Sequence, residues 1–337
     1  MVSIKGRAVP TSQDGADYRE PLAAEEAPEA ADSVAEHEVR EGQVDAASHG
    51  ERLDKWLVKL APEFSRNHLQ SLVERGHARV DGQVQRTASR KLRAGQRLLL
   101  ELVPTDESRA FTPQALPLVI VFEDAHLLVI DKPAGLVVHP AAGNWSGTLL
   151  NGLLAHHAAA ATLPRAGIVH RLDKDTSGLM VVGKSLEAVT ALSRAIAARE
   201  VHRHYLALAQ GEVAWAERSI DAPIGRDPVS RVRMAVVASG RPARTDVQRI
   251  ATSGGFSALA CKLHTGRTHQ IRVHLAWMGH PLVADAVYGG VAALGLQRQG
   301  LHAARLGLRH PVYGEWLEFE GPPPADFTQA WAQVTGR

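Results

Sequence analysis

The segment 178–185, GLMVVGKS, restricts the fold more than any other part of the sequence. It matches the phosphate-loop pattern G-x-x-x-x-G-K-[ST] at every fixed position. A phosphate loop needs small, flexible residues whose N–H groups curl around an anion, whereas the four residues between these glycines are all apolar. We therefore expect a strand buried on both faces, with Met180 and Val182 on one face and Leu179 and Val181 on the other. No nucleotide cofactor is predicted.

The residues just before this segment, HRLDKDTSG, offer more chemistry. They place the carboxylate of Asp173 between two cations, Arg171 and Lys174. A carboxylate near cations stays ionised at neutral pH and can act as a nucleophile or a base. The same letters also fit a loop held by structural ion pairs, so the residues alone leave both interpretations open.

Length and composition allow two ordinary domains, because the chain has 337 residues of which 45% are hydrophobic. No apolar run reaches the ~18 residues of a membrane span, and the N-terminus lacks the apolar core of a secretory signal. We expect a cytoplasmic protein with no membrane contact. The single cysteine, Cys261, cannot form an internal disulfide, and its place in the alternating sequence ALACKL predicts a buried strand residue.

Charge is distributed unevenly along the chain. Residues 1–48 hold four Lys/Arg and eleven Asp/Glu, a balance of −7, so the other 289 residues carry +9. With almost no large apolar side chains, this segment cannot offset the entropy of ordering, and we expect a disordered acidic tail. The tail either shields the rest of the protein from the wrong polyanions or is a solvated extension without a role. The basic remainder suits a polyanionic partner.

Residues 49–103 predict a compact helix–helix–hairpin unit. Apolar spacing indicates a helix over residues 53–60 that ends before the next proline. A second helix is expected over residues 66–75, with Ser65 as its N-cap and Gly76 at its end. The turn pair DG between ARV and QVQ predicts a hairpin, and RLLLELV predicts a further strand.

Basic side chains gather around the second helix of this unit. Residues 51–103 contain eleven Lys/Arg against six Asp/Glu. We interpret the group as a face that contacts RNA phosphates, the alternative being a merely solvated surface. Its members are Arg66, His68, Arg75 and Arg79.

Strand and helix signals alternate from residue 117 to the end of the chain. After a linker, residues 104–116, short apolar runs such as VIVFED and LLVIDKP are broken by charge, Pro or Gly. Residues 187–199 carry the clearest helix signal between strands. We expect an α+β domain over residues 117–337, built on a mostly antiparallel mixed sheet.

Two resemblances extend this interpretation. The blocks RLDKWL, SRNHLQSLVERGHARVDGQ and AGQRL resemble the small RNA-binding domain named after ribosomal protein S-four, which implies docking on structured RNA. The larger region resembles the RluA/RluD family of RNA pseudouridine synthases. That resemblance rests on GIVHRLDKDTSGLMVVGKS together with VFEDAHLLVIDKPAGLVVHPAAGN, REVHRHYLALAQGEV, PIGRDP, LHTGRTHQIRVHLAWMGHPLVADAVYGG and LHAARLGLRHP, which follow one another in the family's order.

The second resemblance implies a reaction and roles for several residues. Uracil is detached from ribose at N1, turned, and rejoined through C5 without redox or hydrolysis, so neither a cofactor nor a metal is implied. Asp173 corresponds to the catalytic carboxylate, Arg171 to the arginine that fills the space left by the flipped base, and Tyr205 to the tyrosine that packs on that base. Arg272 corresponds to the arginine that pairs with the carboxylate, and Arg267 is the other candidate for this pairing or for phosphate.

Three chemical roles stay open for the carboxylate: attack on the anomeric carbon, attack on the uracil ring, or removal of a sugar proton to form a glycal. His139, His170, His269 and His274 are expected to line the site or contact RNA. Four histidines at 264, 269, 274 and 280 lie close together in the sequence, but their spacing matches no usual zinc pattern and no cysteine pair accompanies them.

The resemblance implies ribosomal RNA of the large subunit, or its assembly precursor, as the partner, with the stem-loop called helix 69 as the target of a monomeric enzyme. One alternative is a family member that modifies another rRNA or tRNA uridine. A second is a catalytically idle RNA-binding factor in ribosome assembly. An idle binder has no chemical reason to keep HRLD, Tyr205 and both late arginines.

Overall fold

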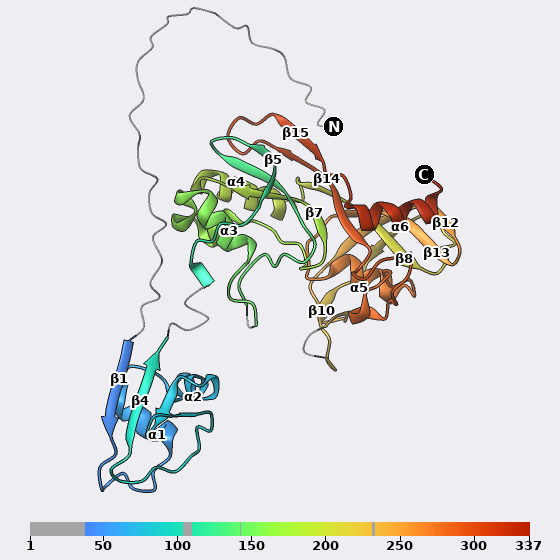
Figure 1. Cartoon of the computed structure of the whole chain (residues 1–337). Helices are drawn as coiled ribbons and strands as arrows, with labels where there is room; N and C mark the ends of the chain where they lie inside the picture. The colour runs from blue at the N-terminus through green and yellow to red at the C-terminus, as the bar shows by residue number, and fades with distance from the viewer. Residues whose placement is uncertain (1–37, 104–109, 142, 231–232) are drawn as a thin grey trace, which may run out of the picture. The chain divides into compact units, whose positions relative to one another are not determined.

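The computed structural model describes residues 38–103, 110–141, 143–230 and 233–337. The described residues divide into two compact units, one ending at residue 103 and one beginning at residue 110 (Figure 1). Each unit has its own hydrophobic core. None of the helices in the described ranges is long and apolar enough to cross a lipid bilayer.

Both helices predicted for the first unit are confirmed. Helix α1 spans Leu53–Leu60 and helix α2 spans Arg66–Arg75. The Ser65 hydroxyl accepts a hydrogen bond from the His68 N–H at 3.3 Å, which caps the start of α2. Gly76 ends the helix in the left-handed region, with φ at 92°.

An antiparallel sheet completes the first unit. Its strands are β1 (Glu38–Gln43), β2 (Ala78–Val80), β3 (Gln83–Gln85) and β4 (Arg97–Leu102), in the order β1-β4-β2-β3. The hairpin predicted at the turn DG is therefore confirmed as β2–β3.

The prediction of a disordered tail through residue 48 is wrong for residues 38–48. Strand β1 pairs with β4 over its whole length, and Val44 is buried in the core behind it. The pairing satisfies backbone groups on the outer edge of β4, a contribution that the polar composition of this segment does not reveal. The rest of the predicted tail, residues 1–37, lies outside the described residues, as do residues 104–109 of the predicted linker.

The second unit is built on a nine-stranded mixed sheet, in the order β5-β6-β7-β14-β8-β13-β12-β9, with β15 paired to β14. Every pairing is antiparallel except β7 with β14, which confirms the predicted fold class. The strands are β5 (Val119–Glu123), β6 (Leu127–Lys132), β7 (Ser177–Gly183), β8 (His202–Gln210), β9 (Glu217–Asp221), β12 (Arg244–Ser253), β13 (Phe256–Leu263), β14 (Leu301–Arg309) and β15 (Trp316–Glu320). A separate hairpin joins β10 (Ile224–Arg226) to β11 (Met234–Val236).

Helices cover both faces of this sheet (Figure 1). The main core contains residues of α3 (Leu149–His156) and α5 (Gln270–Trp277). Helices α4 (Leu186–Ala197) and α6 (Ala325–Thr335) pack in two further cores. Short 3-10 helices cover Ala158–Thr162, Pro164–Gly167 and Ala286–Tyr288.

Strand β7 separates two cores, as the sequence predicts. Met180 and Val182 lie in the core that includes α3, while Leu179 and Val181 lie in the core that includes α4. All seven residues of β7 are buried. The prediction for Cys261 is also confirmed, because it is 1% exposed within β13.

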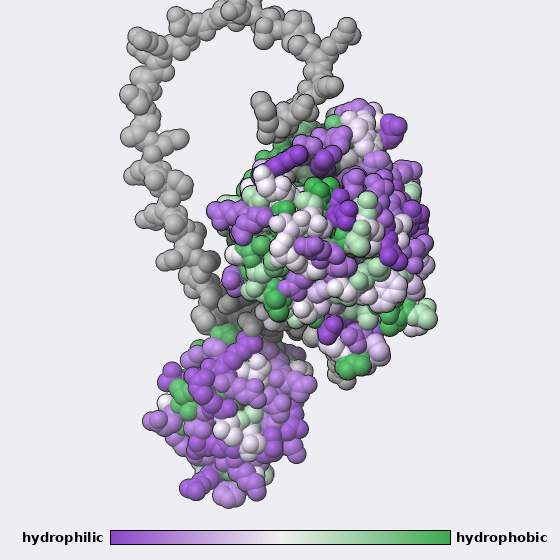
Figure 2. All heavy atoms as spheres, turned by 90° about the vertical axis from the view of Figure 1, so that its right-hand side faces the viewer, coloured by the Kyte–Doolittle hydropathy of each residue, from purple (hydrophilic) through white to green (hydrophobic). Residues whose placement is uncertain are grey.

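Figure 2 shows how polar and apolar side chains are distributed over the visible surface. Hydrophilic side chains dominate the visible face of the first unit, and hydrophobic patches on the second unit are small and scattered. The large exposed apolar residues are likewise spread over several elements. Most apolar side chains are therefore inside the two units.

Gly178 lies where β7 and β14 pair in parallel, opposite Ala303. Its φ is 115°, and a Cβ added there would clash with backbone atoms of Ala303. We expect Gly178→Ala to lower the free energy of unfolding by about 3 kcal/mol, through backbone strain and overpacking. Calorimetry of the full chain measures this loss.

The matched control is Gly254→Ala. Gly254 also has a positive φ, 61°, but open space surrounds the position of an added Cβ. This change should cost about 1 kcal/mol, from conformation alone. Equal losses in the two variants would contradict a close-packing role for Gly178.

Candidate active site

Asp173 lies in the loop between the 3-10 helix Pro164–Gly167 and strand β7. Its side chain is 15% exposed and lines a cleft of about 380 Å³. One carboxylate oxygen, Oδ2, accepts a hydrogen bond from Nη1 of Arg272 at 3.0 Å. The other, Oδ1, lies 3.8 Å from Nε2 of His269. The carboxylate is therefore held on one side by a cation.

The loop that carries Asp173 is anchored by a buried lysine. Lys132, at the end of β6, is 0% exposed, and its ammonium donates to the carbonyl oxygens of Pro133, Leu136 and Lys174 at 2.7 to 3.0 Å. Burial lowers the pKa of Lys132 to about 8. Because Lys174 follows Asp173 directly, this bond fixes the backbone beside the carboxylate.

Arg272, on α5, is 5% exposed and bridges two carboxylates. Besides Asp173, it bonds Asp285 with two parallel hydrogen bonds, from Nε at 2.7 Å and from Nη2 at 2.8 Å. The ring of Tyr288 covers the guanidinium, with its centre 5.0 Å from Cζ. Burial is the largest single influence and opposes the charged form, but the hydrogen bonds and charges of Asp285 and Asp173 together raise the pKa of Arg272 above its usual value. The guanidinium therefore stays charged.

His269 forms the other neighbour of the carboxylate, at the N-cap of α5, with φ at 56°. Its Nδ1 lies 2.8 Å from Oη of Tyr288, and that oxygen accepts a bond from the Met234 N–H at 3.0 Å. The Tyr288 hydroxyl proton is then free to bond Nδ1, which leaves the imidazole proton on Nε2, facing Asp173. Burial lowers the pKa of His269 although Asp173 opposes the shift, which favours a neutral imidazole at pH 7.

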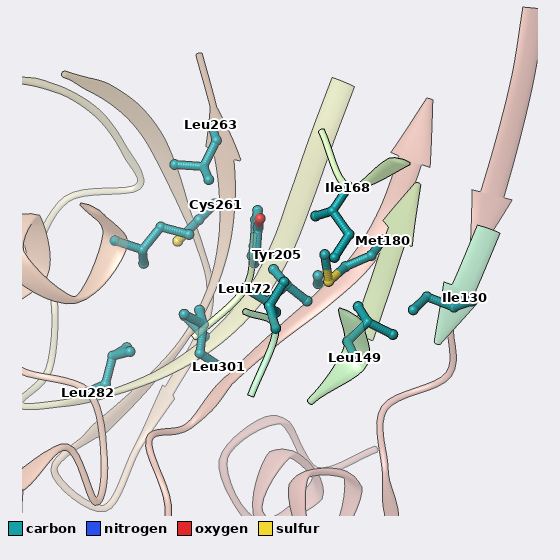
Figure 3. Close-up of a cluster of buried hydrophobic side chains, with 14 of the residues drawn as sticks. Ile130, Leu149, Ile168, Leu172, Met180, Tyr205, Cys261, Leu263, Leu282 and Leu301 are labelled. Carbon is teal, nitrogen blue, oxygen red and sulfur yellow. The ribbon is translucent and has the colours of Figure 1, made fainter. Parts of the chain in front are cut away.

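Tyr205 lies on β8 and lines the same cleft. It is 5% exposed, and burial raises the pKa of its hydroxyl, so the phenol stays protonated at neutral pH. Figure 3 shows its side chain with Cys261 on one side and Ile168 and Met180 on the other. The ring is thus part of the core as well as of the cleft wall.

The structure distinguishes the two late arginines. Arg272 makes the contact with Asp173, whereas Nε of Arg267 donates to the carbonyl oxygen of Pro242 at 3.0 Å. Arg267 and the exposed Arg171 both line the cleft.

His170 also lines this cleft, but one of its nitrogens is engaged. Its Nε2 accepts a hydrogen bond from the Val181 N–H at 3.0 Å. Burial, followed by the charge of Arg203, lowers the pKa of His170 to about 3. The imidazole is therefore neutral and carries its proton on Nδ1.

The predicted RNA face of the first unit is partly engaged within the protein. Arg66 bonds the buried carboxylate of Asp54 at 2.8 Å, and Nε of Arg79 lies 4.0 Å from Glu101. The four residues predicted for this face lie on α2 or on β2: Arg66, His68, Arg75 and Arg79. Arg66 therefore has a structural role in addition to any contact with RNA.

The four late histidines bond to different partners. His264 bonds Asp246, His274 bonds Thr245 and the Ala222 carbonyl, and His280 bonds the Gln210 carbonyl. His269 contacts Tyr288 and Asp173, so the four rings make their contacts with different residues. Within the described ranges, no group of three or more His, Cys, Asp or Glu side chains could hold a metal ion.

The charge of the cleft is strongly positive. Among the described residues that line it, Asp173 is the only carboxylate. Six arginines line it as well: Arg165, Arg171, Arg199, Arg203, Arg267 and Arg272. Such a cleft attracts polyanions, and a carboxylate oriented by a buried arginine at its wall can serve as a nucleophile or a base.

Two family models match the chain. Residues 51–98 match the S4 domain, and residues 126–277 match RNA pseudouridylate synthase. The two matches together define an RNA-modifying enzyme that combines an RNA-binding unit with a catalytic unit. The expected domain order is therefore confirmed.

Curated relatives support the same conclusion. A "Ribosomal large subunit pseudouridine synthase D" of Nitrosomonas europaea is 48% identical over 285 residues, covering 82% of this chain and 82% of the relative. A protein of the same name from Xanthomonas campestris pv. campestris is 45% identical over 301 residues, covering 86% and 90%. The chain belongs to the RNA pseudouridine synthase family, and it is therefore an isomerase.

Solved structures agree with this assignment. The structure named Human RNA Pseudouridylate Synthase Domain Containing 1 is 28% identical, with a TM-score of 0.50 over 66% of this chain and 86% of that one. Human RNA Pseudouridylate Synthase Domain Containing 4, at 23% identity and a TM-score of 0.51, supports the fold alone.

Sequence reasoning missed Asp285, Tyr288, Lys132 and Arg203. All four lie inside blocks quoted for the family resemblance, in DKPAG, REVHRHYLALAQGEV and LVADAVYGG, so a signal was present. The roles of Asp285, Tyr288 and Lys132 depend on contacts with Arg272 or with the loop of Asp173, which are formed in space and not along the sequence. The amino-acid sequence alone does not show which residues become partners in the folded protein.

Neutralising Asp285 should loosen Arg272 and misplace the carboxylate that it orients. We expect Asp285→Asn to lower the rate of pseudouridine formation about 10- to 100-fold, while RNA affinity changes little. Single-turnover rates and binding titrations measure both quantities. Glu320→Gln, which removes an exposed partner of Arg305, is the matched control and should leave both unchanged. Equal rates for Asp285→Asn and the wild type would contradict the positioning role.

Proposed function

We propose that this protein converts specific uridines of large-subunit ribosomal RNA, the 23S RNA, to pseudouridine. The observation that carries the proposal is the Asp173 carboxylate bonded to buried Arg272 at the wall of a cleft rich in arginine. The names of the curated relatives support the choice of RNA. The stem-loop called helix 69 is the target that we would test first.

In the proposed reaction, the bond between C1′ of the ribose and N1 of uracil breaks and a bond between C1′ and C5 forms. The proton on C5 leaves and N1 gains one, so the product is an isomer and the atoms balance. Asp173 acts as the nucleophile or base. Attack on C1′, attack on the ring and removal of a sugar proton all use the same ionised carboxylate, which Arg272 keeps oriented.

The target base must leave the RNA stack to meet Asp173. Flipping costs a few kcal/mol, which contacts in the cleft must offset. We infer that Tyr205 packs against the flipped base, because its ring forms part of the cleft wall. Arg171 is exposed and lies two residues before Asp173. It is the candidate to fill the space that the flipped base leaves in the RNA.

The first unit would dock the enzyme on structured RNA through the face around α2. The match to an RNA-binding domain supports this role. A monomeric state, a cytoplasmic location, and the choice between free rRNA and an assembling subunit stay predictions.

Removing the proposed catalytic charge gives a direct test. Asp173→Asn should lower the rate of pseudouridine formation at least about a thousand-fold, because an amide is neither a nucleophile nor a base. RNA affinity should stay within a few-fold of the wild type. Retained turnover would disprove the nucleophile or base role.

The deciding experiment maps pseudouridine across total RNA from cells with and without the protein. Large-subunit sites that vanish, and return with the wild type but not with Asp173→Asn, would establish both the reaction and its targets. Sites lost only from tRNA or another rRNA would replace the proposed substrate. No lost site would favour a role in ribosome assembly without turnover on these RNAs.

The first unit can be tested by removing residues 1–109. The second unit keeps its cores, since no core residue of the first unit belongs to them. We expect weaker binding to structured rRNA, with the difference largest at low salt, because phosphate contacts are lost. Filter binding across a salt series measures the change. Unchanged affinity at every salt concentration would contradict the docking role.

A further inference from the structure

One buried arginine of the cleft wall has no part in the mechanism. Arg203 is 6% exposed and lies two residues before Tyr205 on β8, so both side chains leave the strand on the same face. Both line the cleft. Nε of Arg203 is buried and, among the described residues, has no hydrogen-bond partner. The only carboxylate in the described cleft wall, Asp173, is bonded to Arg272 instead.

A buried guanidinium without a counter-charge is costly, because it cannot lose its proton to escape the penalty. Proteins keep such a cation buried when an anion pairs with it. No side chain that lines this cleft supplies that anion to Arg203. The structure therefore points to an anionic ligand.

The segment around Gly266 leaves room for the guanidinium of Arg203. A Cβ added to Gly266 would lie 2.8 Å from Nη1 of Arg203. The φ of Gly266 is not in the left-handed region, so its conformation does not demand glycine. The missing side chain instead provides space between β8 and the segment before α5, where Arg203 reaches the cleft.

Other polar atoms beside the cleft also lack partners. Five buried side-chain nitrogens in the described residues make no hydrogen bond, and three of them belong to residues of this cleft: His139, His170 and Arg203. His170 accepts at Nε2, so its unpaired Nδ1 carries a proton and is a donor. Donors without partners suit a ligand rich in acceptor oxygens.

Two more arginines add positive charge to the same cleft. Arg165 lies in the 3-10 helix Pro164–Gly167, and Arg199 follows the C-terminus of α4. Both are exposed and line the same cleft as Arg203. Their charges add to the positive potential that attracts a polyanion to the cleft.

We propose that Arg203 binds a phosphodiester oxygen of the RNA strand beside the target nucleotide, and that Arg165 and Arg199 bind further phosphates along the strand. This proposal rests on the proposed function and deepens it. A uracil carbonyl is the other acceptor within the same RNA, but it is neutral and leaves the charge of Arg203 uncompensated. A phosphate supplies both the charge and the acceptor oxygens.

The first test uses the full chain with Arg203→Met, which keeps a long side chain and removes the charge. Affinity for a labelled 23S stem-loop RNA should fall about 10- to 100-fold at moderate salt. The slope of log affinity against log salt should become shallower by about 0.7 to 0.9. The melting temperature should hold or rise, because an unpaired buried charge has gone.

Arg218→Met is the matched control, because Arg218 is exposed on the edge strand β9 and lies outside the cleft. It should change none of these quantities. A lower melting temperature with unchanged RNA affinity in Arg203→Met would assign Arg203 a structural role and overturn the proposal.

A second test identifies the atom that is bound. In synthetic stem-loop RNAs, one phosphodiester at a time is replaced by an uncharged methylphosphonate. The wild type should lose affinity at one linkage near the target uridine, and Arg203→Met should be insensitive there. Identical responses of the two proteins at every linkage would overturn phosphate binding and leave the uracil carbonyl as the acceptor.

These readouts separate the two proposals. Failure of the wild type to form pseudouridine in 23S RNA would reject the proposed substrate. The comparison of salt slopes is then repeated on an unrelated structured RNA, because phosphate contacts do not depend on sequence. A shallower slope for Arg203→Met on that RNA supports phosphate binding, and equal slopes reject it, whichever RNA is the natural substrate.

Discussion

The active site depends on one buried cation shared between two carboxylates. Arg272 uses Nε and Nη2 for Asp285 and Nη1 for Asp173, so each hydrogen bond has a fixed direction. A lysine has no planar fork and could not define both directions at once. Because Asp285 secures the guanidinium, the position of Asp173 is set before any RNA arrives. The group of three carries a net charge of −1 inside an otherwise basic cleft.

The cleft must attract a polyanion and at the same time leave the Asp173 carboxylate available for the reaction. Many arginines draw a polyanion into the cleft, but the same arginines could each pair with a lone carboxylate and mask it. Here Arg272 alone contacts Asp173, and Arg267 is bonded to the Pro242 carbonyl. The remaining arginines of the wall are therefore available to the nucleic acid, while the carboxylate keeps one oxygen that no arginine bonds.

The sequence predicts correctly those elements whose limits are set by neighbouring residues in the chain. Helix α2 begins and ends at the predicted residues because Ser65 and Gly76 act on their own neighbours, and β7 follows from a run of four apolar residues. Strand β1 was missed because its partner, β4, lies more than fifty residues away in the chain. Asp285 and Arg203 were missed for a related reason, since the importance of each depends on what surrounds it in space.

The order of strands has a consequence for how the enzyme is made. Strands β7 and β8 are close in sequence but do not pair with each other, because β14 lies between them. Strand β7, which follows the loop of Asp173, and strand β8, which carries Tyr205, are thus joined by β14, a strand that is made long after both. Such long-range pairing is slow to form. A nascent chain therefore contains Asp173 and Tyr205 long before it has a catalytic site, because the two residues are held together only after β14 has been made.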